Sequence, residues 1–535
     1  MGKSRSTFWL THFFVKCRME FNMFNSRPKN PPGLLLIALI AVLGTLLACA
    51  RVAGPATAPW SVSGDAPAEY NNGPPLDQLK PQTRNPEDPI LTPTPDPARV
   101  LPALRTEPEQ YTVKSGDTLG TIAQEYSTSL NLLIEANELV NPNLLSIGQV
   151  LNIPAPTPGP TGPEFKIIPD SELVYGPASV DFDISAFIRD RGGYLASYRE
   201  EVDGVSLTSD SIIYRISYEY SVNPRLLLAL LEYQSGWVTK QNPAEESLDY
   251  PIGLVNEWRK GLYHQLAWAA NNLNRGYYTW RVNGVGAWVT FDGQIVPIAP
   301  TINAGTAGVQ HFFSQLFNRS QWERAVTENG LYAIYSDFFG YPFDRAIEPL
   351  LPALLSQPSL QLPFEDGVEW AYTGGPHGGW GSGSAWAALD FAPSGDALGC
   401  VSSDDWVVAA ADGTVARSGG GAVVQDLHGD GFEQTGWTLL YFHIESRDRV
   451  PEGTFLRAGD RIGHPSCEGG VSTGTHLHLA RRYNGEWIPA DQNIPFVLDG
   501  WVSRGAGYEY DGYLQRDGQT VEAWAGRSTI NVIQR

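Results

Sequence analysis

Basic residues are scarce in this chain of 535 residues, which has 37 Lys and Arg against 58 Asp and Glu. The formal net charge is therefore −21 at pH 7. A surface this acidic repels the phosphates of nucleic acids and of anionic lipids. We expect no nucleic-acid partner, and we expect no membrane contact that depends on a basic surface.

Long apolar runs are also scarce, and the clearest one runs from Leu34 to Leu47. It is shorter than the ~20 residues of a spanning helix, and the basic residues Arg27 and Lys29 precede it. This pattern predicts a secretion signal over residues 1–48. Leu46-Leu47-Ala48-Cys49 resembles a bacterial lipobox, which implies lipidation at Cys49 and an exported protein anchored at the cell envelope. An uncleaved anchor helix is the alternative.

Cysteine is the third scarce residue, with 4 in the chain. Cys17 and Cys49 belong to the N-terminal segment, which leaves Cys400 and Cys467 in the mature chain. An oxidising compartment outside the cytoplasm favours a disulfide between them, which would stabilise the fold by roughly 4 kcal/mol through chain entropy. Two free thiols are the less favoured alternative.

Two Pro-rich segments, predicted as a tether over 49–108 and a linker over 155–170, flank a compact unit at 109–154. Its pattern predicts a strand, two helices and a strand, with Asp117 and Thr118 as candidate N-caps of the first helix. The motifs YTV at 111–113, GDTL at 116–119 and the spacing of Asn137 resemble the LysM module. This resemblance implies binding to the N-acetylglucosamine-containing glycan of peptidoglycan. A βααβ spacer that binds no ligand is the alternative.

Residues 171–363 have helical periodicity and predict a mainly α domain. Asn223-Pro224-Arg225, Gln234-Ser235-Gly236-Trp237 and Ile302-Asn303-Ala304-Gly305 resemble motifs of lysozyme-like lytic transglycosylases, in which Glu precedes that Ser as the general acid. Gln234 occupies the position here, and an amide does not supply an acidic proton. Glu232 would point away from the same cleft. We expect a degenerate, non-catalytic domain that binds glycan, with an active hydrolase as the alternative.

Aromatic side chains of this helical region allow two interpretations. Trp237, Tyr277, Tyr278 and Trp280 could stack on sugars in a groove, or they could fill the core. We favour the core for most of them.

Residues 364–535 have short alternating runs separated by Asp-Gly and Gly-Asp turns, and they predict an antiparallel all-β domain. Strand alternation places His476 and His478 on one face and the neighbouring leucines on the other. His377 and Asp390 lie upstream in a Gly-rich segment, and His443 follows Tyr441 on a predicted strand, where both side chains point to one face. Catalytic zinc commonly has three protein ligands of the His and carboxylate type. Two histidines and one aspartate fit this pattern.

The same residues, with the run CEGGVSTGTHLHLARRYNG at 467–485, resemble the lysostaphin-like zinc endopeptidases, in particular the β-lytic and staphylolysin-type group. The resemblance implies one zinc ion bound by His377, Asp390 and His478. It implies a catalytic pair, His443 and His476, and leaves open which of the two is the base. His464 and His428 are expected to be structural.

Together these features predict a multidomain cell-wall hydrolase that cleaves the peptide cross-links of peptidoglycan. Its partners would be the glycan and the stem peptide, and its membrane contact would be the lipid anchor alone. A non-enzymatic peptidoglycan-binding scaffold is the main alternative, and a secreted protease that acts on Gly-rich proteins is a weaker one.

Overall fold

Three stretches of the chain are described by the computed structural model: residues 93–114, 117–395 and 398–535. They belong to a single unit of the chain. The predicted signal segment, Cys49, most of the predicted tether and Gly116 of the LysM motif lie outside these stretches. Within them, no helix has the length and apolar content that a membrane span requires.

The first folded region has the predicted order of strand, helix, helix and strand. Its elements are β1 (Glu109–Thr112), α2 (Leu119–Glu125), α3 (Leu130–Ala136) and β2 (Val150–Ile153), and β1 pairs with β2 in antiparallel fashion. Thr118 is the N-cap of α2 and accepts a hydrogen bond from the backbone N–H of Thr121. Asn137 bonds to the backbone of Leu133 and of Asn152, which ties the end of α3 to β2. The βααβ prediction is confirmed.

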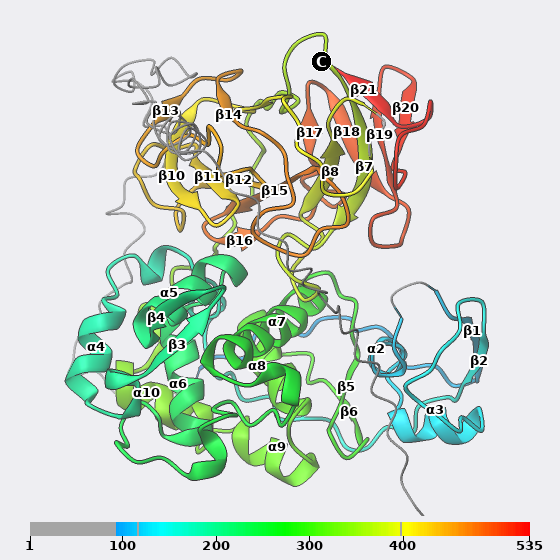
Figure 1. The fold of residues 1–535 in the computed structure, drawn as a ribbon. Helices are drawn as coiled ribbons and strands as arrows, with labels where there is room; N and C mark the ends of the chain where they lie inside the picture. The colour runs from blue at the N-terminus through cyan, green and yellow to red at the C-terminus, as the bar shows by residue number, and fades with distance from the viewer. Residues whose placement is uncertain (1–92, 115–116, 396–397) are drawn as a thin grey trace, which may run out of the picture. The chain divides into compact units, whose positions relative to one another are not determined.

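Helices dominate the middle region (Figure 1). They are α4 (Ile184–Arg191), α5 (Ser209–Tyr220), α6 (Pro224–Ser235), α7 (Leu262–Arg281), α8 (Ala304–Ser314), α9 (Arg319–Ala325) and α10 (Leu331–Phe339). Two short hairpins accompany them, β3 (Arg199–Val202) with β4 (Val205–Thr208) and β5 (Ala287–Val289) with β6 (Ile295–Pro297). α6 is the central helix, because its residues 226–231 are all fully buried. Asn223 caps its start, Pro224 takes the first helical position, and Gly236 ends it with a φ of 69°.

The C-terminal region is built from strands. They are β7 (Glu369–His377), β8 (Ala388–Ala392), β9 (Val407–Val408), β10 (Gly413–Gly419), β11 (Ala422–Asp426), β12 (Trp437–Phe442), β13 (Phe455–Leu456), β14 (Arg461–Gly463), β15 (Leu477–Tyr483), β16 (Glu486–Trp487), β17 (Val497–Leu498), β18 (Trp501–Gly505), β19 (Gly512–Arg516), β20 (Gln519–Glu522) and β21 (Val532–Gln534). The main sheet has the order β13-β10-β11-β12-β15-β8-β7-β21, with β16 paired to β15. All of its strand pairs are antiparallel, as predicted.

The two faces of the main sheet carry different residues. Leu477 and Leu479 of β15 join one hydrophobic core with Leu439 and other residues of the β domain. Ala480 on the opposite face joins the core of the helical region, as do Leu440 of β12 and Trp487 of β16. Every residue of β15 is therefore buried. The helical region and the β domain share a core on the same sheet face that carries His478.

The segment predicted as a linker over 155–170 is instead packed against the helical region. Ile167 and Ile168 are fully buried in its core, and the N–H of Ile167 donates to Thr306 Oγ1. The predicted end of the helical domain at residue 363 also differs, because Leu360 and Leu362 join the core of the β domain. In both segments, apolar side chains next to Pro-rich sequence are buried in a hydrophobic core.

Candidate metal centre and active site

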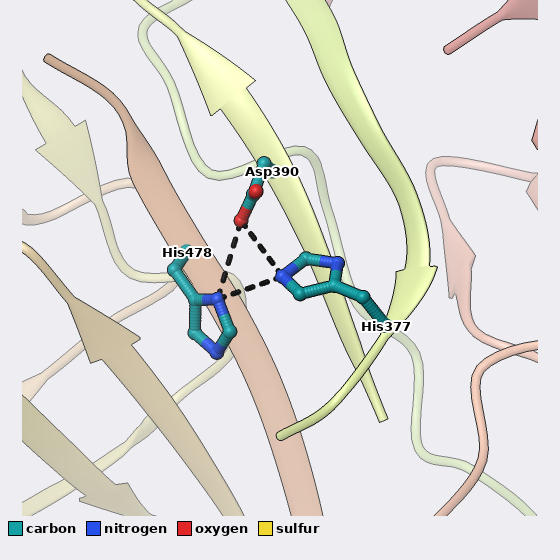
Figure 2. Close-up of side chains that lie close together, drawn as sticks. All are labelled: His377, Asp390 and His478. Atoms are coloured by element: carbon teal, nitrogen blue, oxygen red, sulfur yellow. Dashed lines mark hydrogen bonds and ion pairs between the residues drawn. The ribbon is translucent and has the colours of Figure 1, made fainter. Parts of the chain in front are cut away.

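Three adjacent strands of the main sheet bring His377, Asp390 and His478 together (Figure 2). His377 ends β7, Asp390 is the middle residue of β8, and His478 is the second residue of β15. His478 and Asp390 are direct partners across the β15–β8 pair. Antiparallel pairing thus joins residues that lie far apart in the sequence, and all three side chains are buried.

The ligand atoms form a nearly regular triangle. His377 Nε2 lies 2.9 Å from His478 Nδ1, and each of these nitrogens lies 3.2 Å from Asp390 Oδ1. Tetrahedral zinc with ligand bonds of about 2.0–2.1 Å has ligand–ligand separations of about 3.3 Å. Oδ1 of Asp390 is buried and receives no hydrogen bond from any described residue. The donor set and its spacing therefore fit a zinc ion.

The two ring nitrogens that face away from the triangle are fixed by backbone carbonyls. His377 Nδ1 donates to the carbonyl of Gly375 at 2.8 Å, and His478 Nε2 donates to that of Gly379 at 3.1 Å. These bonds leave His377 Nε2 and His478 Nδ1 with lone pairs toward the triangle. Such outer hydrogen bonds set the tautomer and orientation of metal-binding histidines.

The protonation states of His377, Asp390 and His478 depend on one another. Burial opposes the ionisation of Asp390, but the adjacent His377 and His478 hold the pKa of its carboxyl well below the usual value. Burial also opposes the ionisation of His377, and the charge of Asp390 nevertheless holds its pKa above the usual value. Burial lowers the pKa of His478. Asp390 is therefore an anion, as a metal-binding carboxylate must be.

The other two predicted histidines lie beside this triangle. The rings of His443 and His476 are 4.6 Å apart, and His476 Nε2 lies 3.6 Å from Asp390 Oδ1. His443 Nδ1 donates to the carbonyl of Glu468 at 2.9 Å, and His476 Nδ1 donates to that of Gly474 at 2.8 Å. Burial, together with the neighbouring His476 and His478, lowers the pKa of His443 to about 3. His443 is therefore neutral at physiological pH.

Tyr510 is a site residue that the sequence analysis missed. Its ring stacks on that of His377 with centroids 4.3 Å apart, and its backbone has a φ of 69°. Glu509 beside it accepts a hydrogen bond from the N–H of Gly378. Both residues lie between β18 and β19, outside the sequence motifs of the domain, so no local pattern predicts their place in the site.

Gly374 shows how tightly the cluster is packed. A Cβ at this position would lie 2.8 Å from Asp390 Oδ2. Glycine is needed here because β7 approaches the carboxylate of β8 this closely. The Gly374-Gly375 pair before His377 was the available sequence signal for a close approach.

The predicted disulfide partners also meet. The sulfurs of Cys400 and Cys467 are 2.08 Å apart, the separation of a disulfide bond. Cys467 precedes Glu468, whose carbonyl holds His443. His464, predicted to be structural, is buried against Trp406 and donates to the carbonyl of Asp405.

The candidate site residues of the helical region do not form a common site. Glu232 accepts hydrogen bonds from the N–H and the hydroxyl of Thr239, so it holds a loop. Gln234 Nε2 is buried and makes no hydrogen bond to a described residue. The four candidate sugar-stacking aromatics, Trp237, Tyr277, Tyr278 and Trp280, are all buried, which confirms their assignment to the core.

Comparison with protein families assigns three parts of the chain. Residues 397–490 match the model of peptidase family M23, residues 111–154 match the LysM domain, and residues 166–351 match the N-terminal domain of LasA. The M23 match begins after His377 and Asp390, so the triangle extends beyond it. The chain thus has a metalloendopeptidase domain behind a LysM domain. The likeness of the helical region to lytic transglycosylases remains a prediction.

Two curated relatives agree with these assignments. Protease LasA of Pseudomonas aeruginosa (strain UCBPP-PA14) is 26% identical over 348 residues, which cover 60% of this chain and 74% of the relative. The beta-lytic metalloendopeptidase of Lysobacter enzymogenes is 28% identical over 167 residues, which cover 30% of this chain and 90% of that protein. Among solved structures, the deep-sea M23 metalloprotease pseudoalterin is 24% identical and covers 34% of this chain and 100% of that one, with a TM-score of 0.27. The chain is a metalloendopeptidase that acts on peptidoglycan.

Proposed function

We propose that this protein is a zinc endopeptidase that cleaves the peptide cross-links of peptidoglycan while its LysM module holds the glycan. One observation carries the proposal: three ligand atoms lie within 3.2 Å of one another on adjacent strands, with two further histidines beside them. The LysM match and the similarity to protease LasA and to the beta-lytic metalloendopeptidase support the substrate.

In the proposed mechanism His377, Asp390 and His478 hold the zinc ion. The chemistry that zinc supplies when bound is polarisation of the scissile carbonyl and activation of water at neutral pH. Nδ1 of both His443 and His476 is committed to a backbone carbonyl, so Nε2 of each ring is available to accept a proton. The ring that takes the proton of the attacking water at Nε2 becomes an imidazolium, and the new Nε2–H then stabilises the developing oxyanion and passes the proton to the leaving amine, while the second ring orients the water through its Nε2 lone pair.

The rest of the chain brings this site to its substrate. We propose that the lipid predicted at Cys49 anchors the protein to the cell envelope, facing the wall, and that the LysM module binds the glycan. Tethering raises the local concentration of the peptide near the active site without any new contact to that peptide. This matters for a chain whose net charge of −21 does not attract an acidic wall polymer.

Amino-group release from purified peptidoglycan tests the proposal. The whole exported chain should be used, because the helical region and the β domain share a core. We expect release that stops with a zinc chelator and returns with added zinc, together with about one bound zinc per chain. New termini among the products would identify the bond that is cleaved.

Two variants provide the controls. His478→Ala should abolish both bound zinc and release, whereas His264→Ala, an exposed histidine of α7, should change neither. A folded wild-type chain that binds peptidoglycan but holds no zinc and releases no amino groups would instead support the non-enzymatic scaffold.

A further inference from the structure

A cleft of about 1030 Å³ lies between the helical region and the β domain. Val205, Tyr214 and Tyr263 are among the residues on its helical side. Its β side contains Trp380 and the Gly-rich segments 419–421 and 469–470. A cleft of this size lies at the upper limit of small-molecule pockets, so it has room for an extended peptide segment.

The β side of the cleft adjoins the catalytic histidines. A Cβ on Gly470 would lie 3.0 Å from the ring of Phe442 and 3.7 Å from Cε1 of His443. Trp380 packs on Phe442 with ring centroids 4.6 Å apart, and its neighbour Gly379 accepts the hydrogen bond from His478. A chain that passes the catalytic site can therefore continue into the cleft.

The walls suit an extended peptide. Val205, Tyr214 and Val471 line the cleft with 57%, 46% and 100% of their surface exposed. A Cβ on Gly419 or Gly420 would meet no atom within 4 Å, so the β wall leaves room for another backbone to approach. Large exposed apolar side chains that share one concave surface mark binding sites rather than ordinary surface.

Charged side chains that line the cleft have partners of opposite charge, some of them outside the cleft. Arg215 contacts Asp203 at 2.7 Å and Glu219 at 2.8 Å. Arg417 is bound by Glu433 at 2.9 Å. Affinity in this cleft should therefore come from apolar and aromatic contacts to a peptide, with little dependence on salt.

The helical wall is fixed to the β domain. Arg417 of β10 lies over the ring of Tyr218 at 3.9 Å, and Arg482 of β15 donates to the carbonyl of the same residue. On α7, Asn271 and Arg275 hold the loop that carries Trp380 through hydrogen bonds to Gly383 and Ser382. Both walls are thus held in one geometry.

We propose that this cleft binds the stem peptide on one side of the scissile bond, so that the helical region supplies part of the substrate specificity. The inference rests on the proposed peptidoglycan endopeptidase function and extends it. The helical region is then a substrate-binding wall of the peptidase, with Tyr214 as its main contact and Gly419 as the opposing surface.

Kinetics of the full chain on two substrates test the proposal. The first is the cross-linked muropeptide dimer isolated from the wall that the enzyme digests. The second is a short synthetic peptide with two residues on each side of the cleaved bond, too short to fill the cleft. For Tyr214→Ala we expect a KM for the dimer about tenfold higher and an unchanged kcat, because the lost contact stabilises the bound substrate and the transition state equally. The kinetics on the short peptide should not change, because that peptide does not reach Tyr214.

Gly419→Leu provides an independent test from the opposite wall. Gly419 has open space around its Cβ position and no positive φ, so the variant protein should fold normally. The leucine side chain should then narrow the cleft. It should raise the KM for the dimer in the same way. Trp258→Ala is the matched control, because Trp258 is 91% exposed on the helical region and does not line the cleft.

The outcomes separate the two levels of the proposal. Equal KM values for the wild type and both variants on the dimer would overturn the cleft assignment, and so would faster cleavage by either variant, since the cleft or its wall would then obstruct the substrate. A wild-type chain that cleaves neither the wall nor the dimer would overturn the proposed function itself.

Discussion

Buried carboxylates occur in both the helical region and the β domain, but their surroundings differ. Glu172 of the helical region is fully buried and accepts hydrogen bonds from Arg225 at 2.7 and 2.9 Å, from Asn223 at 3.3 Å, and from the hydroxyl of Tyr335. Asp390 of the β domain is also buried, with 8% of its surface exposed, yet its Oδ1 receives no hydrogen bond from a described residue.

The difference separates a structural network from a candidate metal site. Every acceptor of Glu172 has a fixed donor, so no position is left for an ion. Asp390 has its unsatisfied oxygen next to two imidazole nitrogens that carry lone pairs. A buried carboxylate oxygen that receives no hydrogen bond and lies beside other lone pairs would be stabilised by a bound cation.

Asp390→Asn should produce the largest effect, because it removes the anionic ligand and keeps the side-chain volume. We expect loss of bound zinc and a fall in the rate of wall hydrolysis of at least about 10⁴-fold, because carbonyl polarisation and water activation are lost with the ion. Metal analysis and amino-group release measure both quantities. Retained zinc with full activity would show that Asp390 is not a ligand, and the contrast with Glu172 would fail.

His443→Ala separates metal binding from proton transfer within the same cluster. We expect zinc to stay bound and kcat to fall roughly 10²–10⁴-fold, the usual contribution of a general acid or base. His464→Ala is the control, because His464 is equally buried but lies outside the triangle and contacts Trp406. Loss of zinc in His443→Ala would instead make His443 part of the metal-binding set.

Glu172→Gln tests the structural side of the comparison. It leaves the buried guanidinium of Arg225 without its counter-charge, which typically costs about 3–5 kcal/mol of stability. Chemical denaturation should detect this loss, while zinc content stays at the wild-type level. Glu246→Gln, at an exposed position of the same region, should change stability by less than about 0.5 kcal/mol. Loss of zinc from folded Glu172→Gln would contradict the separation of the two networks.

The sequence allowed much of the histidine and aspartate cluster to be predicted, because the information for it is local. Strand alternation predicted His476 and His478 on the face opposite Leu477 and Leu479. In the structure both imidazoles lie beside Asp390, whereas both leucines join the core of the β domain. The chemistry of the side chains and the family resemblance then added His377, Asp390 and His443.

Other features depend on contacts that no local pattern encodes. Tyr510 reaches His377 only because the β18–β19 turn packs against the end of β7. Ile167 and Ile168 follow a Pro-rich run that resembles a linker, and the core that they fill is made by distant helices. The shared core also depends on Ala480 and Leu440. Their side chains are typical of any strand, so the residue types do not predict contact with the helical region.

Glu486 is an intermediate case, and it gives the smallest predicted effect. It is buried between the helical region and the β domain, where it accepts a hydrogen bond from Tyr277 and pairs with Arg281 at 2.9 Å. Burial raises its pKa to about 6 despite the opposing charge of Arg281, and the charge of Asp170 adds to the rise. The folded protein therefore holds a proton on Glu486 more tightly than the unfolded chain does.

Stability should consequently fall as the pH rises through the interval from about 4.5 to above 6. A folded pKa of about 6 against an ordinary value of 4.5 corresponds to roughly 2 kcal/mol. Glu486→Gln removes this titration, so the variant should gain about that much relative to the wild type between pH 4.5 and 7.5. Denaturant unfolding of both proteins at the two pH values measures the gain. An equal stability difference at both values would mean that the donors around Glu486 satisfy its charge as fully as those around Glu172 do.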